Sequence, residues 1–320
     1  MECECCGKPL RSGRELKRRI NNNEGQKVAI VTGANKGIGF AIVKGLAKTF
    51  NGDLYLTSRN EARGLSAVKE LSDEGIKVLY HQLDIDDESS IVKFAGFIKG
   101  KYGGIDILIN NAAIAFKNAA IEPFALQAKI TLQTNYFNTK LTCEQLFPLL
   151  NSGARVVNLS SSAGYLLRIP SDDLKRKFAS SDSTLTVQEL DAMIRDFIES
   201  ADAGNHVEKG WPNSTYVVSK VGLSALSRIQ QREIDRDTSR KDIVINHVHP
   251  GYVDTDMTSH KGPLTPEQGA MSSLFAANLP SGTNVKGQYI WYDCSIVDWV
   301  TGKWTIDPVK PKKIKRSRWA

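Results

Sequence analysis

Tyr216 and Lys220 are the residues of this 320-residue chain whose types and spacing best suit acid–base chemistry. A tyrosine and a lysine four positions apart lie on one face of a helix, one turn from each other. A phenol normally titrates near pH ~10, so it is a poor proton shuttle at neutral pH. A nearby ammonium group favours the phenolate and lowers that pKa. The pair predicts a proton-transfer site, although an exposed tyrosine beside a solvated lysine has the same spacing.

A glycine-rich stretch near the start of the chain is the second candidate site. The spacing G-x-x-x-G-x-G lies between a predicted strand at 27–32 and a helix-period segment at 38–50. In that context backbone N–H groups at a helix N-terminus bind a pyrophosphate. We therefore predict a dinucleotide site, against the alternative of a generic turn, at Gly33, Asn35, Lys36, Gly37, Ile38 and Gly39.

The charge at the end of the second predicted strand (53–58) bears on which dinucleotide binds. Arg59 stands where an acidic residue would accept a hydrogen bond from the ribose 2′-hydroxyl of NAD, and Lys36 adds a second cation. Two cations suit a 2′-phosphate, so the sequence favours NADP(H) unless both are ordinary surface residues. Asp84, after the third strand, is placed either to meet the adenine or to cap the helix that begins near Asp86 and Asp87.

Polar residues also follow the fourth and fifth predicted strands, at 105–110 and 154–160. Asn110 and Asn111 are expected to line the cofactor crevice, although paired asparagines alone indicate only a turn. Asn135, among apolar neighbours, is either a satisfied core amide or part of a site. The triplet Ser160–Ser162 is by itself a turn signal.

The remaining elements alternate in the manner of a doubly wound fold. Further strands are predicted at 77–82, 242–248 and 287–292, with helix-period segments such as 61–71 between most of the strands. Such alternation implies right-handed crossovers, and hence a seven-stranded parallel sheet of the Rossmann type with helices on both faces. We predict one domain at 26–298, between an N-terminal tail (1–25) and a basic C-terminal tail (299–320).

The net charge of +7 arises in those tails. Residues 1–25 hold six Lys/Arg against four Glu, and residues 301–320 hold seven against one Asp, which leaves the body nearly neutral. Nucleic acid is therefore not the expected partner, and the basic stretch 312–316 is at most a nuclear signal. Apolar runs are too short to span a membrane, and the start lacks the core of a secretory signal.

Cysteine usage fits a reducing compartment, so we expect a cytoplasmic protein. Cys143 and Cys294 are isolated, and Cys3, Cys5 and Cys6 crowd the N-terminus. The C-x-x-C pair resembles half of a zinc knuckle, but no second pair follows, so we predict no metal site.

In order along the chain, the motifs T-G-A-N-K-G-I-G, N-N-A-A, the Asn135 helix, N-L-S-S and Y-V-V-S-K resemble the classical short-chain dehydrogenases/reductases over roughly residues 27–295. Longer runs, among them Glu208–Trp211, are similar to the animal NADPH-dependent carbonyl reductases. The resemblance implies a reductase of ketones, aldehydes or quinones. Ala113 and Asn138 depart from the family pattern, each replacing a glycine, and only small packing adjustments are expected from them.

The resemblance also assigns the catalytic roles. Ser161, with Ser162 as the fallback register, would bind the substrate carbonyl oxygen. Tyr216 would protonate that oxygen. Lys220 would hold the nicotinamide ribose and lower the pKa of the tyrosine, and Asn135 would orient a water that links Lys220 to solvent.

After the sixth strand, His249–Met257 resembles the family's P-G-x-V-x-T segment. We expect His249 itself to be structural or to line the substrate pocket, because Tyr216 already fills the role of proton donor. The resemblance implies a mobile lid at roughly 258–268. It also extends the cofactor-binding set to Asp84, Ile85, Asn111, Tyr216, Lys220, Pro250, Gly251, Val253 and Thr255. A hydrophobic substrate pocket is expected around Ile114, Phe116, Tyr252 and Met257, beside Ser161 and Tyr216.

The 54 residues between Ser161 and Tyr216 are far more than most family members have there. Thr186-x-x-Glu189 is a capping box that precedes apolar residues at helical spacing, so we predict an ordered helical insertion at about 163–212. The resemblance implies that this insertion covers the helices that other members use to dimerise, which favours a monomer. Two other functions remain open: a cofactor-binding regulator with little turnover, and a nucleic-acid-associated protein acting through the basic C-terminus.

Overall fold

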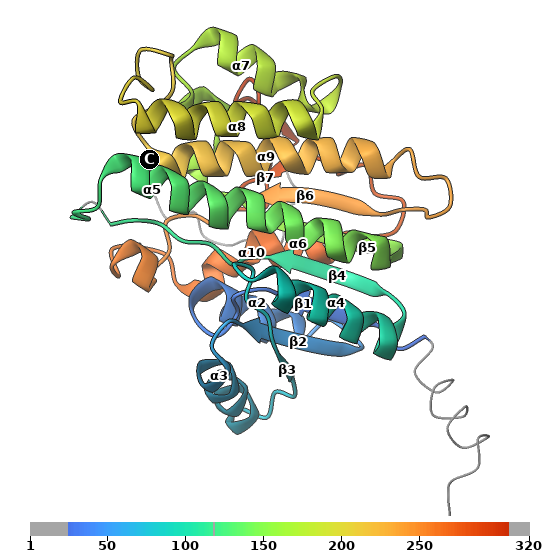
Figure 1. The fold of residues 1–320 in the computed structure, drawn as a ribbon. Coiled ribbons are helices and arrows are strands. Elements are labelled where there is room, and N and C mark those ends of the chain that lie inside the picture. Colours follow the sequence, from blue (N-terminus) through green and yellow to red (C-terminus); the bar gives the residue numbers. More distant parts are fainter. Residues whose placement is uncertain (1–24, 118, 307–320) are drawn as a thin grey trace, which may run out of the picture.

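The computed structural model describes residues 25–117 and 119–306 (Figure 1). The C-x-x-C pair, the tail residues 1–24 and the basic stretch 312–316 lie outside the described residues. The strands are β1 (Val28–Val31), β2 (Asp53–Ser58), β3 (Leu79–Gln82), β4 (Ile105–Asn110), β5 (Leu150–Leu159), β6 (Val244–Val248), β7 (Tyr289–Ile290), β8 (Ile296–Val297) and β9 (Trp304–Ile306). The helices of eight or more residues are α2 (Gly37–Leu46), α3 (Glu61–Asp73), α4 (Glu88–Tyr102), α5 (Phe124–Leu132), α6 (Thr139–Leu146), α7 (Asp172–Ala179), α8 (Val187–Asp202), α9 (Thr215–Ile234) and α10 (Pro266–Ala277).

The strands form one sheet in the order β3-β2-β1-β4-β5-β6-β7-β8-β9. The first seven are mutually parallel, as predicted. The strand order reverses between β1 and β4, and this is the position at which doubly wound sheets bind ligands beyond their carboxyl edges.

Two short antiparallel strands, β8 and β9, extend the sheet beyond the seven that we predicted. The predicted sheet therefore had two strands too few, because β8 and β9 add to the sheet beyond the last apolar run that we assigned as a strand. The predicted domain boundary at 298 is also too early. Trp299 is 1% exposed and donates from Nε1 to the carbonyl of Gly164 at 2.6 Å, so the folded domain continues past it.

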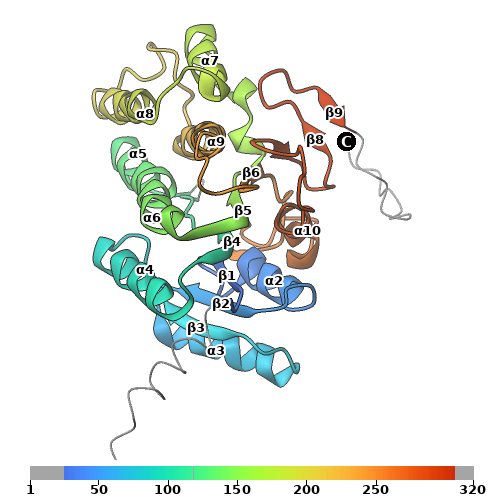
Figure 2. The same ribbon diagram turned by 90° about the vertical axis from the view of Figure 1, so that its right-hand side faces the viewer.

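Helices cover both faces of the sheet (Figure 2). On one face, α2, α3 and α10 bury residues such as Ile42 and Leu71 against strand side chains such as Leu56. On the other face, α4 and α6 pack over β1 and β4, and α9 packs over β6. Burying a side chain of this size contributes about 2 kcal/mol, so the two faces together hold the sheet rigid beneath its carboxyl edge.

The insertion before α9 is ordered and helical, as predicted. It contains α7 and α8, and α8 packs against α5 and α9 (Figure 1). The predicted capping box is present: the Thr186 hydroxyl accepts from Glu189 N at 3.1 Å, and the Glu189 carboxylate accepts from Thr186 N at 2.8 Å. Phe197 and Trp211 are buried in one cluster with residues of α5 and α9. The insertion is thus a part of the core.

Within the described residues, none of the helices is both long enough and apolar enough to cross a membrane.

Candidate functional site

The predicted site residues meet at the carboxyl edge of the parallel sheet. Pairing of β1 with β4 brings the glycine turn beside the Asn110–Asn111 corner. Pairing of β5 with β6 sets Leu159 opposite Val248, so the serine triplet and His249 leave the sheet side by side. The sheet register therefore brings together segments that are far apart in the sequence.

The glycine turn has the backbone geometry that the motif predicted. Gly33 and Gly37 have φ of +60° and +58°, a region that residues with a side chain rarely adopt. A Cβ on Gly39 would lie 2.5 Å from the Asn111 side-chain nitrogen and 2.8 Å from the Cα of Ala34. The turn can therefore approach the β4 corner this closely only because these positions are glycines, which have no Cβ.

Asn111 holds the turn in place from the neighbouring strand end. Its side-chain nitrogen donates to the carbonyls of Thr32 at 2.9 Å and Gly33 at 3.0 Å. In return, the Thr32 hydroxyl accepts from the backbone N–H groups of Asn111 and Ala112, both at 3.0 Å. Asn111 thus ties the two strand ends together, as expected, whereas the buried Asn110 side chain donates to Asn158 at 2.7 Å.

The N-terminus of α2 has no side-chain cap, unlike those of α3, α4 and α8. The side chains of Asn60, Asp87 and Thr186 cap α3, α4 and α8, whereas Lys36 makes no side-chain cap for α2. The first N–H groups of α2 are thus left without a side-chain acceptor, above a glycine cradle that a Cβ would fill. These features fit the pyrophosphate of a dinucleotide, with Asn35 and Ile38 flanking the cradle.

Both cations expected at a 2′-phosphate are exposed, and each faces a carboxylate from another segment. Lys36 Nζ lies 2.5 Å from Asp256, and the guanidinium of Arg59 lies 4.0 Å from Asp86. Their side chains are 61% and 65% exposed, and ion pairs this exposed are weak. A dianionic phosphate would therefore compete well for both cations.

The contacts in the loop after β3 distinguish the two roles predicted for Asp84. Asp84 does not cap α4, because the capping side chain is Asp87, which accepts from Ser89 N at 2.9 Å. Asp84 instead accepts from Asp86 N at 3.0 Å and lies partly exposed beside buried Ile85. Its side chain is thus available at the position expected to meet the adenine.

Tyr216 and Lys220 lie one turn apart near the start of α9. The ammonium of Lys220 is 5.7 Å from the centroid of the Tyr216 ring and donates to the carbonyl of Leu159 at 2.7 Å. Lys220 is 3% exposed. The buried lysine is thus fixed between α9 and the end of β5.

The expectation that Lys220 lowers the pKa of Tyr216 is not what the structure shows. Burial raises the pKa of Tyr216 to about 12, and a hydrogen bond with Ser161 opposes that rise. Burial lowers the pKa of Lys220 to about 8. The ammonium of buried Lys220 is directed at the Leu159 carbonyl, and desolvation is the largest cause of the shift in the Tyr216 pKa. The phenol therefore keeps its proton at neutral pH.

Ser161 is the serine of the triplet whose side chain faces the tyrosine. It lies close enough to the phenol to oppose the rise in the Tyr216 pKa, and its hydroxyl accepts from Ala163 N at 3.2 Å. Ser160 is 3% exposed and bonds to Ser224 of α9 at 2.7 Å, which is a packing contact. The geometry favours Ser161 over Ser162 as the residue that shares the site with Tyr216.

Asn135 lies in η1 (Gln133–Asn138), a π-helical turn between α5 and α6. Its side chain accepts from Ile114 N at 2.8 Å and donates to the Ile114 carbonyl at 2.9 Å and to Ser219 at 3.1 Å. Such turns are frequent at functional sites. These contacts fix the strand-end loop at Ile114, while the water link to Lys220 stays a prediction.

The segment after β6 lies over the glycine turn. A Cβ on Gly37 would come within 3.3 Å of the Thr255 methyl group. Pro250 and Val253 are buried, and Gly251 has φ of +90°. This placement fits the expected role of the segment at the cofactor.

The predicted substrate residues differ in exposure, and one of them contacts Tyr216. Ile114 and Phe116 are partly buried, whereas Tyr252 and Met257 are 51% and 42% exposed. The sulfur of Met257 lies 4.0 Å from the phenol oxygen of Tyr216. The phenol of Tyr216 thus has a thioether side chain beside it.

Comparisons with known proteins identify the family. Residues 27–170 match the family described as short chain dehydrogenase. The chain is 45% identical over 265 residues to carbonyl reductase (NADPH) 1 of Rattus norvegicus, covering 82% of this chain and 95% of the relative. It is 43% identical over 270 residues to the Homo sapiens protein of that name, covering 84% and 97%. The chain belongs to the short-chain dehydrogenase/reductase family.

Solved structures share the fold of this short-chain dehydrogenase/reductase. Salutaridine reductase from Papaver somniferum superposes with a TM-score of 0.74 at 29% identity, covering 84% of this chain and 100% of the other. Menthone neomenthol reductase from Mentha piperita superposes with a TM-score of 0.68 at 30% identity, covering 84% and 99%.

Two groups around the site of this short-chain dehydrogenase/reductase, Asp86 and Tyr289, have roles that were not apparent from the sequence, whereas His249 was expected to be structural or substrate-lining. Asp86 accepts from Thr134 at 2.8 Å and from Asn138 at 2.7 Å, so the departure at 138 adds an anchor for the loop near Arg59. His249 and Tyr289 contact the serine turn. No local pattern marks these residues, because each contact joins segments distant in sequence.

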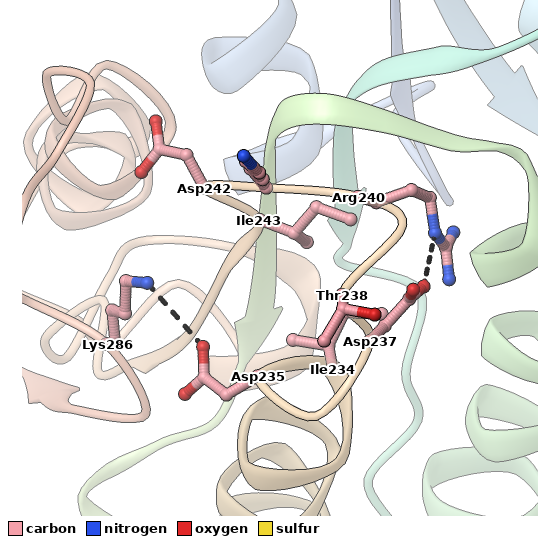
Figure 3. Close-up of a pocket in the computed structure, with 9 residues that line it drawn as sticks. Ile234, Asp235, Asp237, Thr238, Arg240, Asp242, Ile243 and Lys286 are labelled. Carbon is pink, nitrogen blue, oxygen red and sulfur yellow. Dashed lines mark hydrogen bonds and ion pairs between the residues drawn. The ribbon is translucent and has the colours of Figure 1, made fainter.

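A hollow at the far end of α9 is separate from this site (Figure 3). Two ion pairs lie within it: Asp235 faces Lys286 at 3.5 Å, and Arg240 faces Asp237 at 2.7 Å. Its first lining residue, Ile234, is roughly 27 Å along the helix axis from Tyr216 at 1.5 Å per residue. Elsewhere in the described chain, too, there is no group of three His, Cys, Asp or Glu side chains that could hold a metal ion.

Proposed function

We propose that this protein reduces ketones, aldehydes and quinones to alcohols or hydroquinones, with NADPH as the hydride donor. The observation that carries the proposal is the meeting of Tyr216, Lys220 and Ser161 beside the glycine cradle. Relatives at 43–46% identity bear the name carbonyl reductase (NADPH) 1, which supports the substrate class and the cofactor.

The residues proposed to hold the dinucleotide divide into three groups. The α2 N-terminus and Gly33, Gly37 and Gly39 would take the pyrophosphate, and Lys36 and Arg59 the 2′-phosphate. The segment Pro250–Thr255 would take the nicotinamide end. The chemistry that bound NADPH supplies is hydride donation to a carbonyl carbon.

Each catalytic residue has one proposed task. Ser161 donates a hydrogen bond to the substrate carbonyl oxygen and so orients it. Tyr216 gives that oxygen its proton, since its phenol is protonated at neutral pH. Lys220, fixed by the Leu159 carbonyl, stands where it can return a proton to the phenol. Asn135 holds the Ile114 loop that borders the substrate.

The apolar surroundings support hydrophobic substrates. Ile114, Phe116, Tyr252 and Met257 offer aliphatic, aromatic and thioether surface and no formal charge. Flat aromatic ketones and quinones bury their rings well against such surfaces.

The proposal further takes the protein to be a cytoplasmic monomer. The insertion helix α8 covers α5 and α9, the helices expected to form dimers in relatives without an insertion. Buried Cys143 and Cys294 are free thiols, which suits a reducing compartment. Sedimentation equilibrium should give a mass near 35.3 kDa, and a mass of twice that value would contradict the monomer.

Turnover separates this proposal from a cofactor-binding regulator. We expect NADPH oxidation with a panel of quinones and aromatic ketones, and slower oxidation of NADH. Tyr216→Phe should lower kcat by roughly 10³-fold because the proton donor is lost, with NADPH affinity unchanged. Tight NADPH binding without turnover across the panel would favour the regulator, and a Tyr216→Phe enzyme with near-normal kcat would remove the tyrosine from its role.

A further inference from the structure

The peptide group that joins Ser161 to Ser162 has both of its polar atoms held by side chains from later strands. The phenol of Tyr289 donates to the carbonyl oxygen of Ser161 at 2.5 Å. The N–H of Ser162 donates to Nδ1 of His249 at 2.9 Å. Because both atoms belong to one planar unit, two bonds of opposite sense resist rotation of that plane.

His249 can play its part in only one protonation state. Its Nδ1 accepts from Ser162 N and also from Gly251 N at 3.3 Å, so the proton of the neutral ring is on Nε2. Burial lowers the pKa of His249 to about 4, which keeps the ring neutral at physiological pH. His249 therefore joins the serine turn to the Pro250–Gly251 segment proposed to hold the nicotinamide end.

Tyr289 is held as firmly as the peptide that it contacts. It is fully buried, and its ring stacks on His247 with the centroids 4.9 Å apart and the planes at 13°. In the sheet, His247 lies opposite Tyr289. Neither ring nitrogen of His247 has a hydrogen-bond partner among the described residues, so its contribution here is the flat face that orients the phenol.

The orientation of this peptide decides where the serine side chain points. Ser161 is extended, with φ −171° and ψ 166°, and a change in ψ swings the Ser162 end of the peptide relative to the Ser161 Cα–Cβ bond. With the peptide fixed in the surrounding structure, the hydroxyl is aimed at Tyr216. A shift of about 1 Å in such a group is enough to lower turnover by roughly 100-fold.

Building on the carbonyl reduction proposed above, we propose that Tyr289 and His249 are positioning residues, which clamp the Ser161–Ser162 peptide and thereby aim the Ser161 hydroxyl at the substrate carbonyl oxygen.

Three substitutions test the clamp. Tyr289→Phe removes the donor and keeps the ring, and should lower kcat about tenfold with an unchanged KM for NADPH. His249→Leu removes the acceptor and should lower kcat by roughly 10- to 100-fold. His249→Asn places an amide oxygen near the position of Nδ1 and should restore most of that loss.

A matched control separates positioning from general stability. The phenol of Tyr102 in α4 donates to Asp53 at 2.5 Å and is 7% exposed, far from the serine turn in the fold. Tyr102→Phe therefore loses a comparable buried bond and should leave kcat unchanged, even where it lowers Tm as much as Tyr289→Phe does.

The decisive measurement repeats Tyr289→Phe in a Ser161→Ala background. If the phenol acts through Ser161, the second substitution lowers kcat no further than Ser161→Ala alone. An equal tenfold loss in both backgrounds, or a Tyr289→Phe enzyme within twofold of the wild-type kcat, would overturn the clamp.

Hydrogen exchange of the peptide 160–164 gives a readout that does not need turnover. Exchange of the Ser162 N–H should accelerate in His249→Leu and return toward the wild-type rate in His249→Asn, and equal rates in all three proteins would refute the clamp. A wild-type protein that reduces no carbonyl compound would overturn the proposed function alone, since exchange still decides the clamp.

Discussion

The two halves of the candidate site are built in different ways. The cofactor half, at the ends of β1 and β4, is shaped by backbone: Gly33 and Gly37 at positive φ, and Gly39 with no room for a Cβ. The substrate half, at the ends of β5 and β6, is shaped by side chains that hold other segments, as Lys220 holds Leu159 and Tyr289 holds Ser161. A ligand that meets N–H groups needs a bare backbone, whereas a proton donor needs a fixed functional group.

Because the two halves are built differently, we expect substitutions in them to affect different properties of the protein. A change in the cofactor half should act on NADPH affinity and on folding together, because the cradle is also the contact between β1, α2 and β4. A change in the substrate half should act on turnover while NADPH affinity stays the same. Three predictions test the separation.

The largest effect is expected from Gly39→Ala in the cofactor half. The added Cβ would lie 2.8 Å from Ala34 Cα and 2.9 Å from the Gly33 carbonyl, and both are backbone atoms that cannot give way without opening the turn. We expect an NADPH Kd raised at least ~100-fold by calorimetry, and a free energy of unfolding lowered by about 1–3 kcal/mol.

Gly96→Ala is its matched control, because a Cβ there meets no atom within 4 Å and the residue is an exposed position of α4. It should raise the free energy of unfolding by about 0.5–1 kcal/mol and leave the NADPH Kd unchanged. Normal NADPH binding by Gly39→Ala would break the distinction between the two halves.

The next effect concerns the charge of Lys220 in the substrate half. Burial lowers its pKa from 10.5 to about 8, so between these values the unfolded chain holds a proton that the folded protein has lost. Its contribution to the free energy of unfolding should therefore rise by about 2–3 kcal/mol from pH 8 to 10.

Urea unfolding of the wild type and of Lys220→Met at both pH values measures this contribution. The difference in the free energy of unfolding between the two proteins should change in favour of the wild type as the pH rises, and Lys220→Met should lose turnover. Parallel pH profiles would show that the lysine is charged and well solvated in the fold.

The smallest effect is expected from Arg59→Asp, a side chain of the cofactor half that is 65% exposed. Removing a cation from the 2′-phosphate should lower the ratio of kcat/KM for NADPH to that for NADH by about 10- to 100-fold. This ratio is measured for the wild type and for Arg59→Asp from initial rates with the same quinone. An unchanged ratio would assign the preference to Lys36.

The parts of the fold that depend on long local patterns could be predicted from the sequence. The seven parallel strands and the capping box at Thr186–Glu189 are present because apolar runs and caps act within a few residues. Strands β8 and β9, only two and three residues long, carry no period, and burial of Trp299 depends on a cluster formed by residues far along the chain. The boundary at 298 was wrong for that reason.

Within the site, the sequence by itself determined which groups are present and roughly where. The glycine spacing, the Tyr216–Lys220 turn and the serine triplet are local patterns, and the resemblance to the family ordered them. The tertiary structure decided how those groups are held and in what state. Desolvation raises the pKa of the Tyr216 phenol, and the Ser161 peptide lies between Tyr289 and His249 because the register of β5, β6 and β7 brings them together. Desolvation and strand register are properties of the packed chain, and no short stretch of sequence encodes them.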